Sequence, residues 1–347
     1  MTIREAWRIE RSTAASRAAL VAAGLALAVL VSLPFWGDSG DMRLVVEICY
    51  YLALAQLWNL LAGYTGLVSV GQQAYVGLGG YMFLALSVLW GLPPLLALPF
   101  AGAGAALVAL PTAFVVFRLR GAYFAIGTWV VAEVFRLLLA LVTPLGGGTG
   151  MSLPVAVVQA LAEGRAVRDA LIYYLGLGLG VGTVLLVFLW LRSRYGLALT
   201  AIRDSESAAA SVGVDNPRTK LAVYLIAAAL AGLAGGLIFL EKLRISPDAA
   251  FSVGDWTASV IFIVVIGGIG SIEGPILGTI VFFALRALLA DYGAWYLITL
   301  GLLAVATMLV APQGLWGVIA RSLGLELFPV RRRLRRLRSG TGSRREQ

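Results

Sequence analysis

The polar run from Leu199 to Gly213 is the stretch of this sequence best equipped for chemistry, and long apolar segments flank it on both sides. Arg203, Asp204 and Glu206 occupy one side of a helical pattern in this run. The apolar residues that recur on the opposite side at helical spacing are Leu199, Ile202, Ala209 and Val212. An amphipathic helix with charges of both signs suits contacts with a partner protein, whereas a helix that binds anionic lipid would be strongly basic. We therefore expect a protein-contact helix over 199–212.

A second charged motif, Glu133-Val-Phe-Arg136, lies near the middle of an apolar stretch. Its two charges are three residues apart, so on a helix they share one face and partly neutralise each other. This spacing favours a structural pair that fixes helix packing. The alternative is a gate or a substrate contact.

The residue types that support catalysis are scarce. The sequence has no histidine, which is the commonest general base and metal ligand, and its single cysteine, Cys49, lies in an apolar run. The phosphate-binding pattern Gly-x-x-x-x-Gly-Lys-Ser/Thr is absent, and the lysines are Lys220 and Lys242. We expect no catalytic residue, no metal site and no cofactor bound by this chain, so any ATP chemistry has to come from a separate subunit.

The composition indicates a membrane protein. Apolar residues make up 60% of the 347 residues and charged residues 13%, whereas soluble domains are nearer half apolar and a quarter charged. Each membrane-spanning helix needs roughly 20 apolar residues. The sequence predicts an all-α polytopic membrane protein with about ten transmembrane helices, some of them broken by glycine. The expected spans are roughly 18–36, 44–62, 66–89, 95–117, 121–143, 171–191, 221–240, 257–272, 275–290 and 294–311.

The distribution of basic residues predicts that both termini are cytoplasmic. Basic groups precede the first span, separate the fourth from the fifth and the sixth from the seventh, and follow the tenth, so ten spans place all of them on one side. Before the arginine-rich tail, these groups comprise Arg4, Arg8, Arg11, Arg17, Arg118, Arg120, Arg192, Arg194, Arg218 and Lys220. We expect the first span to remain as an uncleaved helix rather than a signal peptide, because no small-x-small cleavage site follows it.

The expected organisation is a cytoplasmic N-terminal segment over 1–17, a transmembrane domain over 18–317 with a cytoplasmic loop at 192–220, and a basic cytoplasmic tail over 318–347. The formal charge of +9 comes mostly from this tail, which has eight arginines between Arg331 and Arg345. A solvated tail near anionic membrane lipid explains this charge better than a nucleic-acid partner does.

Two glycine-rich segments, at 63–80 and 265–278, interrupt the apolar pattern. Irregular backbone survives in lipid only against protein or beside a water-filled path. The segments therefore indicate either close helix packing through small residues or broken helices that line a translocation path. Pro275 fits the first turn of a new helix, so we expect the chain to break and restart there. The candidate path residues are Gly66, Ser69, Gly71, Gln72, Gln73, Gly268 and Ser271.

Several motifs resemble those of LivM-type permease subunits of bacterial branched-chain amino acid ABC importers, and they cover the chain from about residue 45 to 317. The most specific is the run from Ser193 to Gly213, with its Ala-Ile-Arg-Asp-x-Glu-x-Ala-Ala core. Many relatives have Gly-His-x-Ala where this sequence has Gly71-Gln-Gln-Ala74. The other motifs are Gly63-Tyr-Thr-Gly-Leu-x-Ser-x-Gly71, Leu119-Arg-Gly-Ala-Tyr-Phe-Ala-Ile-Gly-Thr128, Ala132-Glu-x-x-Arg136, Gly146-Gly-Gly-Thr-Gly150, Val265-Ile-Gly-Gly-Ile-Gly-Ser-x-x-Gly-Pro275 and Ala311-Pro-Gln-Gly-Leu315.

The resemblance implies a multi-pass permease of the bacterial inner membrane. It implies a second homologous permease subunit, two cytoplasmic ATPase subunits that bind ATP and Mg²⁺, and a periplasmic substrate-binding protein. It also implies that the cytoplasmic loop forms a coupling helix that docks on the ATPase. The residues assigned to this coupling helix are Ile202, Arg203, Asp204, Glu206, Ala208, Ala209 and Gly213.

The transported solute remains open at the level of sequence. Apolar spans with few charges suit branched-chain or other small neutral amino acids, and urea or short amides are the alternative. An ion-coupled secondary transporter is less favoured, because Glu133 is the one good candidate for an ion-binding carboxylate inside the membrane.

Overall fold

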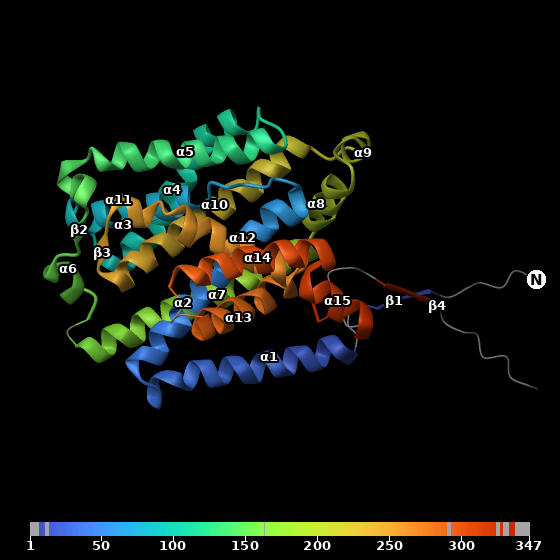
Figure 1. The fold of residues 1–347 in the computed structure, drawn as a ribbon, viewed down its shortest axis with the longest axis horizontal. Coiled ribbons are helices and arrows are strands. Elements are labelled where there is room, and N and C mark those ends of the chain that lie inside the picture. The colour runs from blue at the N-terminus through green and yellow to red at the C-terminus, as the bar shows by residue number, and fades with distance from the viewer. Residues whose placement is uncertain are drawn as a thin grey trace, which may run out of the picture.

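The computed structural model describes residues 7–10, 14–162, 164–289, 293–323, 327–328 and 333–336, and over these residues the chain is mostly helical (Figure 1). The helices are α1 (Ala14–Ser32), α2 (Ser39–Thr65), α3 (Gln72–Val88), α4 (Pro94–Val116), α5 (Ala122–Ala140), α6 (Val155–Gln159), α7 (Arg165–Arg192), α8 (Arg194–Asp204), α9 (Glu206–Ser211), α10 (Asn216–Lys242), α11 (Pro247–Ala250), α12 (Ser259–Gly267), α13 (Glu273–Leu289), α14 (Ala294–Val310) and α15 (Gly314–Leu323). Two short antiparallel pairs join β1 (Trp7–Glu10) to β4 (Arg333–Arg336) and β2 (Met151–Ser152) to β3 (Arg244–Ile245).

The predicted fold class, an all-α polytopic membrane protein, is confirmed. A helix lies at each of the ten predicted spans. Within the described residues, seven helices are long and apolar enough to cross a membrane, or eight if the bent pair α14–α15 counts as one span. Helices α3 and α13 have 17 residues each, below the usual length of a membrane span. The total of ten spans, the position of the termini and the domain boundaries remain predictions, and most of the arginine-rich tail lies outside the described residues.

Helices α2 and α10 form the centre of the bundle. In the apolar 18-residue segment of each of these two helices, 72% of the residues are buried. The corresponding values are 6% for α1 and 17% for α5. Helix α3 packs directly against α10, because glycines let the two backbones touch. A Cβ atom at Gly79 would lie 1.9 Å from the carbonyl oxygen of Gly232, and one at Gly235 would lie 1.9 Å from that of Val76.

Both glycine-rich segments interrupt the helices, as predicted for the second of them. Helix α2 ends in a left-handed Gly66 (φ 72°), and the third predicted span therefore begins only at Gln72. Helix α12 ends at Gly267, after which Gly268 (φ 130°) and Gly270 (φ 78°) adopt backbone conformations that L-residues rarely reach. The chain restarts as α13, and Pro275 lies in its first turn. We call residues 268–272 the α12–α13 break.

Candidate functional site

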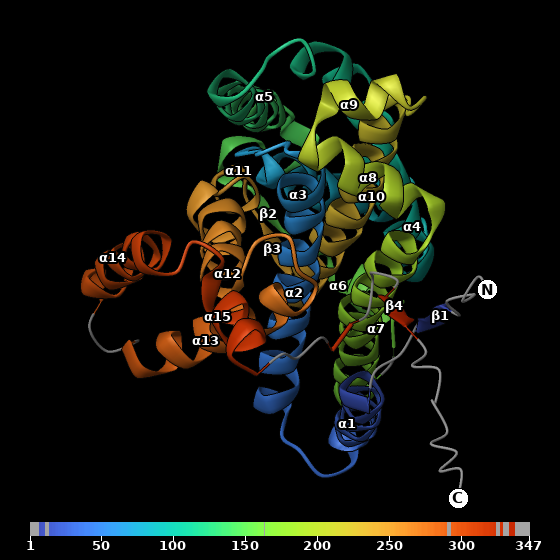
Figure 2. The same ribbon diagram turned by 90° about the vertical axis from the view of Figure 1, so that its right-hand side faces the viewer.

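The predicted contact helix at 199–212 is two helices rather than one. Helices α8 and α9 project from one end of the bundle, toward the viewer in Figure 2. They are separated at Ser205, whose backbone is extended (φ −163°, ψ 115°). Its Oγ accepts a hydrogen bond from the backbone N–H of Ala208 at 3.3 Å and so begins α9 anew. The expectation of one continuous helix is wrong, because a serine in a helical pattern can act as a cap instead of an interior residue.

The restart at Ser205 changes which residues face the bundle. Leu199, Ile202 and Ala209 are buried as expected, at 0%, 4% and 1% exposure. Val212 is 77% exposed, so its expected packing role is wrong. It follows the last residue of α9 and precedes Gly213, whose positive φ of 88° turns the chain toward α10.

The polar side of α9 is tied to the start of α10. The Glu206 carboxylate lies 2.7 Å from the Lys220 ammonium, and the Asn216 amide donates a hydrogen bond to the Glu206 carbonyl oxygen at 2.7 Å. Arg203 and Asp204 form an ion pair with each other at 3.1 Å. Asp204 and Ala208 remain exposed. A displacement of α9 would therefore be transmitted to the first turns of α10.

Replacing Asn216 with alanine is expected to loosen α9 while leaving the bundle folded. The change removes one side-chain hydrogen bond, a loss of about 1 kcal/mol. Hydrogen exchange of the α9 amides should accelerate about fivefold, and exchange in α2 should be unchanged. Arg218→Ala is the matched control, because the Arg218 side chain is 88% exposed. Equal exchange in both variants would contradict the role of Asn216.

Helix α8 reaches the α12–α13 break. A Cβ atom placed on Gly270 would be 3.8 Å from a guanidinium nitrogen of Arg203 and 3.5 Å from the carbonyl oxygen of Gly63. Arg203 thus lies beside the irregular backbone that separates two helices in the bundle. The structure brings this predicted contact residue close to the second group of candidate path residues.

Two amides of α2, which the sequence analysis did not single out, hold the α12–α13 break in place. Asn59 accepts a hydrogen bond from Gly270 N at 2.7 Å and donates one to the Ser271 carbonyl oxygen at 2.7 Å. Gln56 donates to the Ile272 carbonyl oxygen at 2.7 Å. Both side chains are fully buried. Their only signal in the sequence was a pair of amides three residues apart in an apolar helix, where polar side chains need partners.

Two candidate path residues, Gly268 and Ser271, stabilise the turn of the α12–α13 break. Ser271 Oγ donates to the Gly268 carbonyl oxygen at 3.0 Å and accepts from Gly274 N at 3.1 Å. Gly268 packs against the backbone at Gln313 and Gly314, where a Cβ atom would not fit. Gly268 and Ser271 therefore lie together in one turn.

The candidate path residues between the end of α2 and the start of α3 have different surroundings. Ser69 and Gln72 line a small pocket between α2, α3 and α10. Gln73 instead pairs with the buried Thr257 hydroxyl, and Gly71 packs against the backbone of Thr128. Gly66 ends α2. A translocation path through these residues remains a prediction.

The pair Glu133–Arg136 forms as its spacing predicts, with a closest contact of 2.5 Å. Arg136 also contacts the Asp248 carboxylate of α11 at 2.6 Å, a partner 112 residues away that the sequence did not indicate. The pair lies in the second half of α5 (Ala122–Ala140), with Glu133 two residues and Arg136 five residues beyond the middle of the helix. Helix α5 ends at Ala140, so the two charges lie about 6 to 10 Å from its end. That position lets a charge on α11 complete the network.

Comparison with known proteins places these features in context. The family model described as "Branched-chain amino acid transport system / permease component" matches residues 42–312. The chain is 32% identical, over 329 residues, to the high-affinity branched-chain amino acid transport system permease protein LivM of Escherichia coli strain K12, covering 88% of this chain and 76% of the relative. The LivM protein of Salmonella typhimurium strain LT2 is 30% identical over 311 residues, covering 83% of this chain and 73% of the relative. A probable LivH permease protein of Methanocaldococcus jannaschii is 27% identical over 270 residues, covering 73% and 84% respectively. No solved structure matches the chain.

Proposed function

This chain belongs to the family of branched-chain amino acid permease components, and we propose how its helices serve an ATP-driven importer. The chain is the transmembrane permease subunit of such an importer and a multi-pass protein of the bacterial inner membrane. Its substrates are branched-chain or similarly small, neutral amino acids with apolar side chains. The single observation that supports the coupling proposal is that α9 is bonded to the start of α10 while α8 lies beside the α12–α13 break.

The transporter that we propose has four further subunits. A second homologous permease completes the membrane part, two ATPase subunits bind ATP and Mg²⁺ in the cytoplasm, and a periplasmic protein delivers the amino acid. The exposed residues Asp204 and Ala208 face the ATPase, while buried Ile202 and Ala209 anchor the two helices to the bundle. Coupling is then a rigid-body shift of α8 and α9 that moves α10 and the break together.

The mechanism follows from the contacts. ATP binding on the partner subunits supplies the free energy, and this chain supplies the two attachments that transmit it. One attachment runs through Glu206 to Lys220 and Asn216 at the start of α10. The other is the proximity of Arg203 to Gly270, whose backbone α2 holds through Asn59.

The proposal is tested by a bulky substitution on the exposed face. Ala208→Trp should weaken ATPase attachment at least tenfold, a loss of about 1.4 kcal/mol or more of binding free energy, and should lower ATP-dependent leucine uptake in proteoliposomes. The unfolding temperature should stay unchanged, because Ala208 is exposed. The matched control is Ala166→Trp, which changes another exposed alanine, in the first turn of α7 at the other end of the bundle. Unchanged uptake in Ala208→Trp would contradict the docking site, and ATP-independent uptake by the wild-type assembly would contradict the function.

A further inference from the structure

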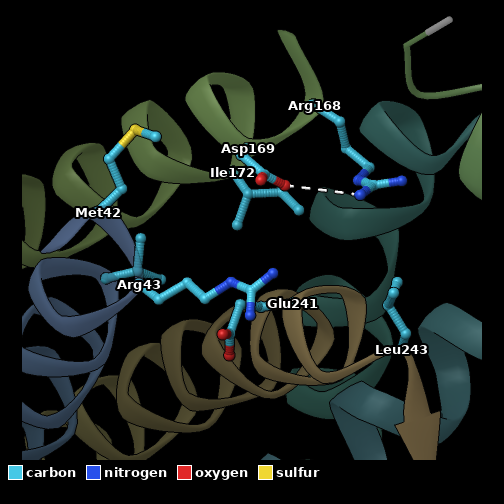
Figure 3. A pocket seen from close by; sticks show the side chains of 8 residues that line it. Met42, Arg43, Arg168, Asp169, Ile172, Glu241 and Leu243 are labelled. Atoms are coloured by element: carbon cyan, nitrogen blue, oxygen red, sulfur yellow. Dashed lines mark ion pairs between the residues drawn. The ribbon is translucent and has the colours of Figure 1, made fainter. Parts of the chain in front are cut away.

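Helix α10 borders a small pocket near each of its ends. The pocket at its C-terminal end lies opposite α8 and α9, where α2 and α7 begin, and its lining includes Arg43, Asp169 and Glu241 (Figures 1 and 3). The Asp169 carboxylate already pairs with Arg168 and Arg165, at 3.6 and 3.7 Å. The pocket nearer the N-terminal end of α10 lies between α2, α3 and α10 and has few polar groups. We call it the α2–α3–α10 pocket.

Hydrogen bonds fix the walls that α2 and α3 contribute to this pocket. The Trp58 indole N–H donates to the Ser69 carbonyl oxygen at 2.8 Å. The Gln72 amide donates to the Leu54 carbonyl oxygen at 2.9 Å. The first bond joins α2 to the turn that precedes α3, and the second joins α2 to the first residue of α3. These two walls therefore keep their positions relative to each other.

The wall that α10 contributes is attached differently. In the described part of the chain, one side-chain hydrogen bond joins α3 to α10, between the hydroxyl groups of Tyr75 and Tyr224 at 2.7 Å. Both residues line the pocket and are buried, at 6% and 3% exposure. Their rings meet edge to face, with centroids 5.7 Å apart. At the pocket, α10 is thus held against α3 by one hydrogen bond and one ring contact.

Farther along, the backbones of α3 and α10 touch at the glycines described above. A Cβ atom on Gly79 or Gly235 would lie 1.9 Å from a backbone oxygen of the other helix, so the two helices have no room to slide closer there. Tyr224 precedes Gly232 by eight residues and lies about 12 Å from this contact along α10. The glycine contact can therefore serve as a pivot, with the tyrosine pair on the side that swings.

The attachment to α9 lies on the same side of this pivot. Lys220, whose ammonium pairs with the Glu206 carboxylate at 2.7 Å, precedes Tyr224 by about one helical turn. A displacement of α9 acts on α10 beside the tyrosine pair and away from the glycine contact. The hydrogen bond between the two hydroxyl groups is then the contact that such a displacement strains first.

The closed pocket also leaves one polar atom unsatisfied. Gln72 is 7% exposed, and its Oε1 atom has no hydrogen-bond partner among the described residues. A buried acceptor without a donor is unfavourable, and water entering a wider pocket would supply the donor. The tyrosine pair therefore favours the closed pocket while the Gln72 amide opposes it, which is the balance that a pocket able to open requires.

We propose that the hydroxyl pair of Tyr75 and Tyr224 is a latch that keeps the α2–α3–α10 pocket closed. Movement of α9 releases the latch by turning α10 about the glycine contact, a small hinge motion. On release the two hydroxyl groups bind water in place of each other, and water reaches Gln72. The inference rests on the proposed function, because it names the contact inside the bundle that ATPase motion breaks. The two tyrosines are positioning residues that set the conformation of α10.

The test measures how readily water reaches the pocket in the full-length chain in lipid nanodiscs. Cys49→Ala removes the single native thiol, and Ala228→Cys places a new thiol in the pocket lining. This parent chain reacts with N-ethylmaleimide through its thiolate, which forms where water is present. Tyr224→Phe and Tyr75→Phe should each raise the reaction rate about fivefold, because each removes the same hydrogen bond and keeps the ring. The double variant should react no faster than either single variant.

Two controls separate the latch from general loosening of the bundle. Tyr81→Phe removes a hydroxyl that is buried in the same helix and has no hydrogen-bond partner among the described residues, so it should leave the rate unchanged. Ala97→Cys, in place of Ala228→Cys, puts the thiol at a fully buried alanine outside the pocket lining, and its rate should be the same in every variant. Equal rates at Ala228→Cys in the parent and both phenylalanine variants overturn the latch. A rise at Ala97→Cys as large as that at Ala228→Cys also overturns it.

The assembled transporter distinguishes this inference from the proposed function. ATP should raise the reaction rate of Ala228→Cys, and Tyr81→Phe should not alter that increase. If leucine uptake depends on ATP while the reaction rate does not, the latch is overturned and the permease function stands. If the parent assembly shows no ATP-dependent uptake, the permease function is overturned, and a fivefold rise in the chain alone still supports the latch.

Discussion

Replacing Asn59 with leucine should destabilise the chain by about 2 to 4 kcal/mol and reduce ATP-dependent uptake more than tenfold. The substitution leaves Gly270 N–H and the Ser271 carbonyl oxygen without their hydrogen-bond partner in the interior of the bundle. Each unsatisfied group in such surroundings costs about 1 to 3 kcal/mol. Arg203 lies beside the same glycine, so the change also disturbs the region through which we propose that ATPase motion reaches the membrane.

Thermal unfolding in detergent and uptake in proteoliposomes measure the two effects of Asn59→Leu separately. Ser87→Ala is the matched control, because Ser87 is buried and its hydroxyl has no hydrogen-bond partner among the described residues. Removing that hydroxyl should be neutral or slightly stabilising. If Asn59→Leu unfolds at the wild-type temperature and transports normally, the α12–α13 break does not depend on α2.

Replacing Gly79 with alanine should separate α3 from α10 and destabilise the chain by about 1 to 3 kcal/mol. The new methyl group would lie 1.9 Å from the carbonyl oxygen of Gly232, a backbone atom that cannot move aside alone. This steric effect outweighs the gain of up to about 1 kcal/mol in helix propensity that alanine brings.

The control for Gly79→Ala is the same substitution at a glycine with free space. Gly178 of α7 has no atom within 4 Å of an added Cβ, so Gly178→Ala should stabilise the chain by up to about 1 kcal/mol. The two variants are therefore predicted to shift the unfolding temperature in opposite directions. Stabilisation by both would contradict the close contact between α3 and α10.

Local patterns predicted the helices and one of the contacts well. Glu133 and Arg136 are three residues apart, and helix geometry alone brings them together. Gly268 and Gly270 mark the α12–α13 break because their backbone conformations are ones that other residues rarely adopt. Ser205 shows the limit of such patterns. Its side chain competes for backbone N–H groups, and that competition replaced a continuous helix by two and exposed Val212.

Contacts between distant residues could not be predicted. Asn59 and Gly270 are 211 residues apart, and Arg136 and Asp248 are 112 apart. Nothing in a single sequence states which polar groups will meet, because that depends on how the helices pack. The pocket formed by Arg43, Asp169 and Glu241 has the same origin, since its charges come from three separate helices.

By itself, the sequence determined that this protein is a helical membrane protein, where its helices lie and where glycine interrupts them. These properties depend on the length of apolar segments and on backbone preferences, both of which act within a few residues. Only the tertiary structure decided that α2 supports the α12–α13 break, that α9 is attached to α10, and that charges gather at the end of the bundle opposite α8 and α9. In an apolar interior each polar group has to find a partner, and the packing of the helices selects which partner is within reach.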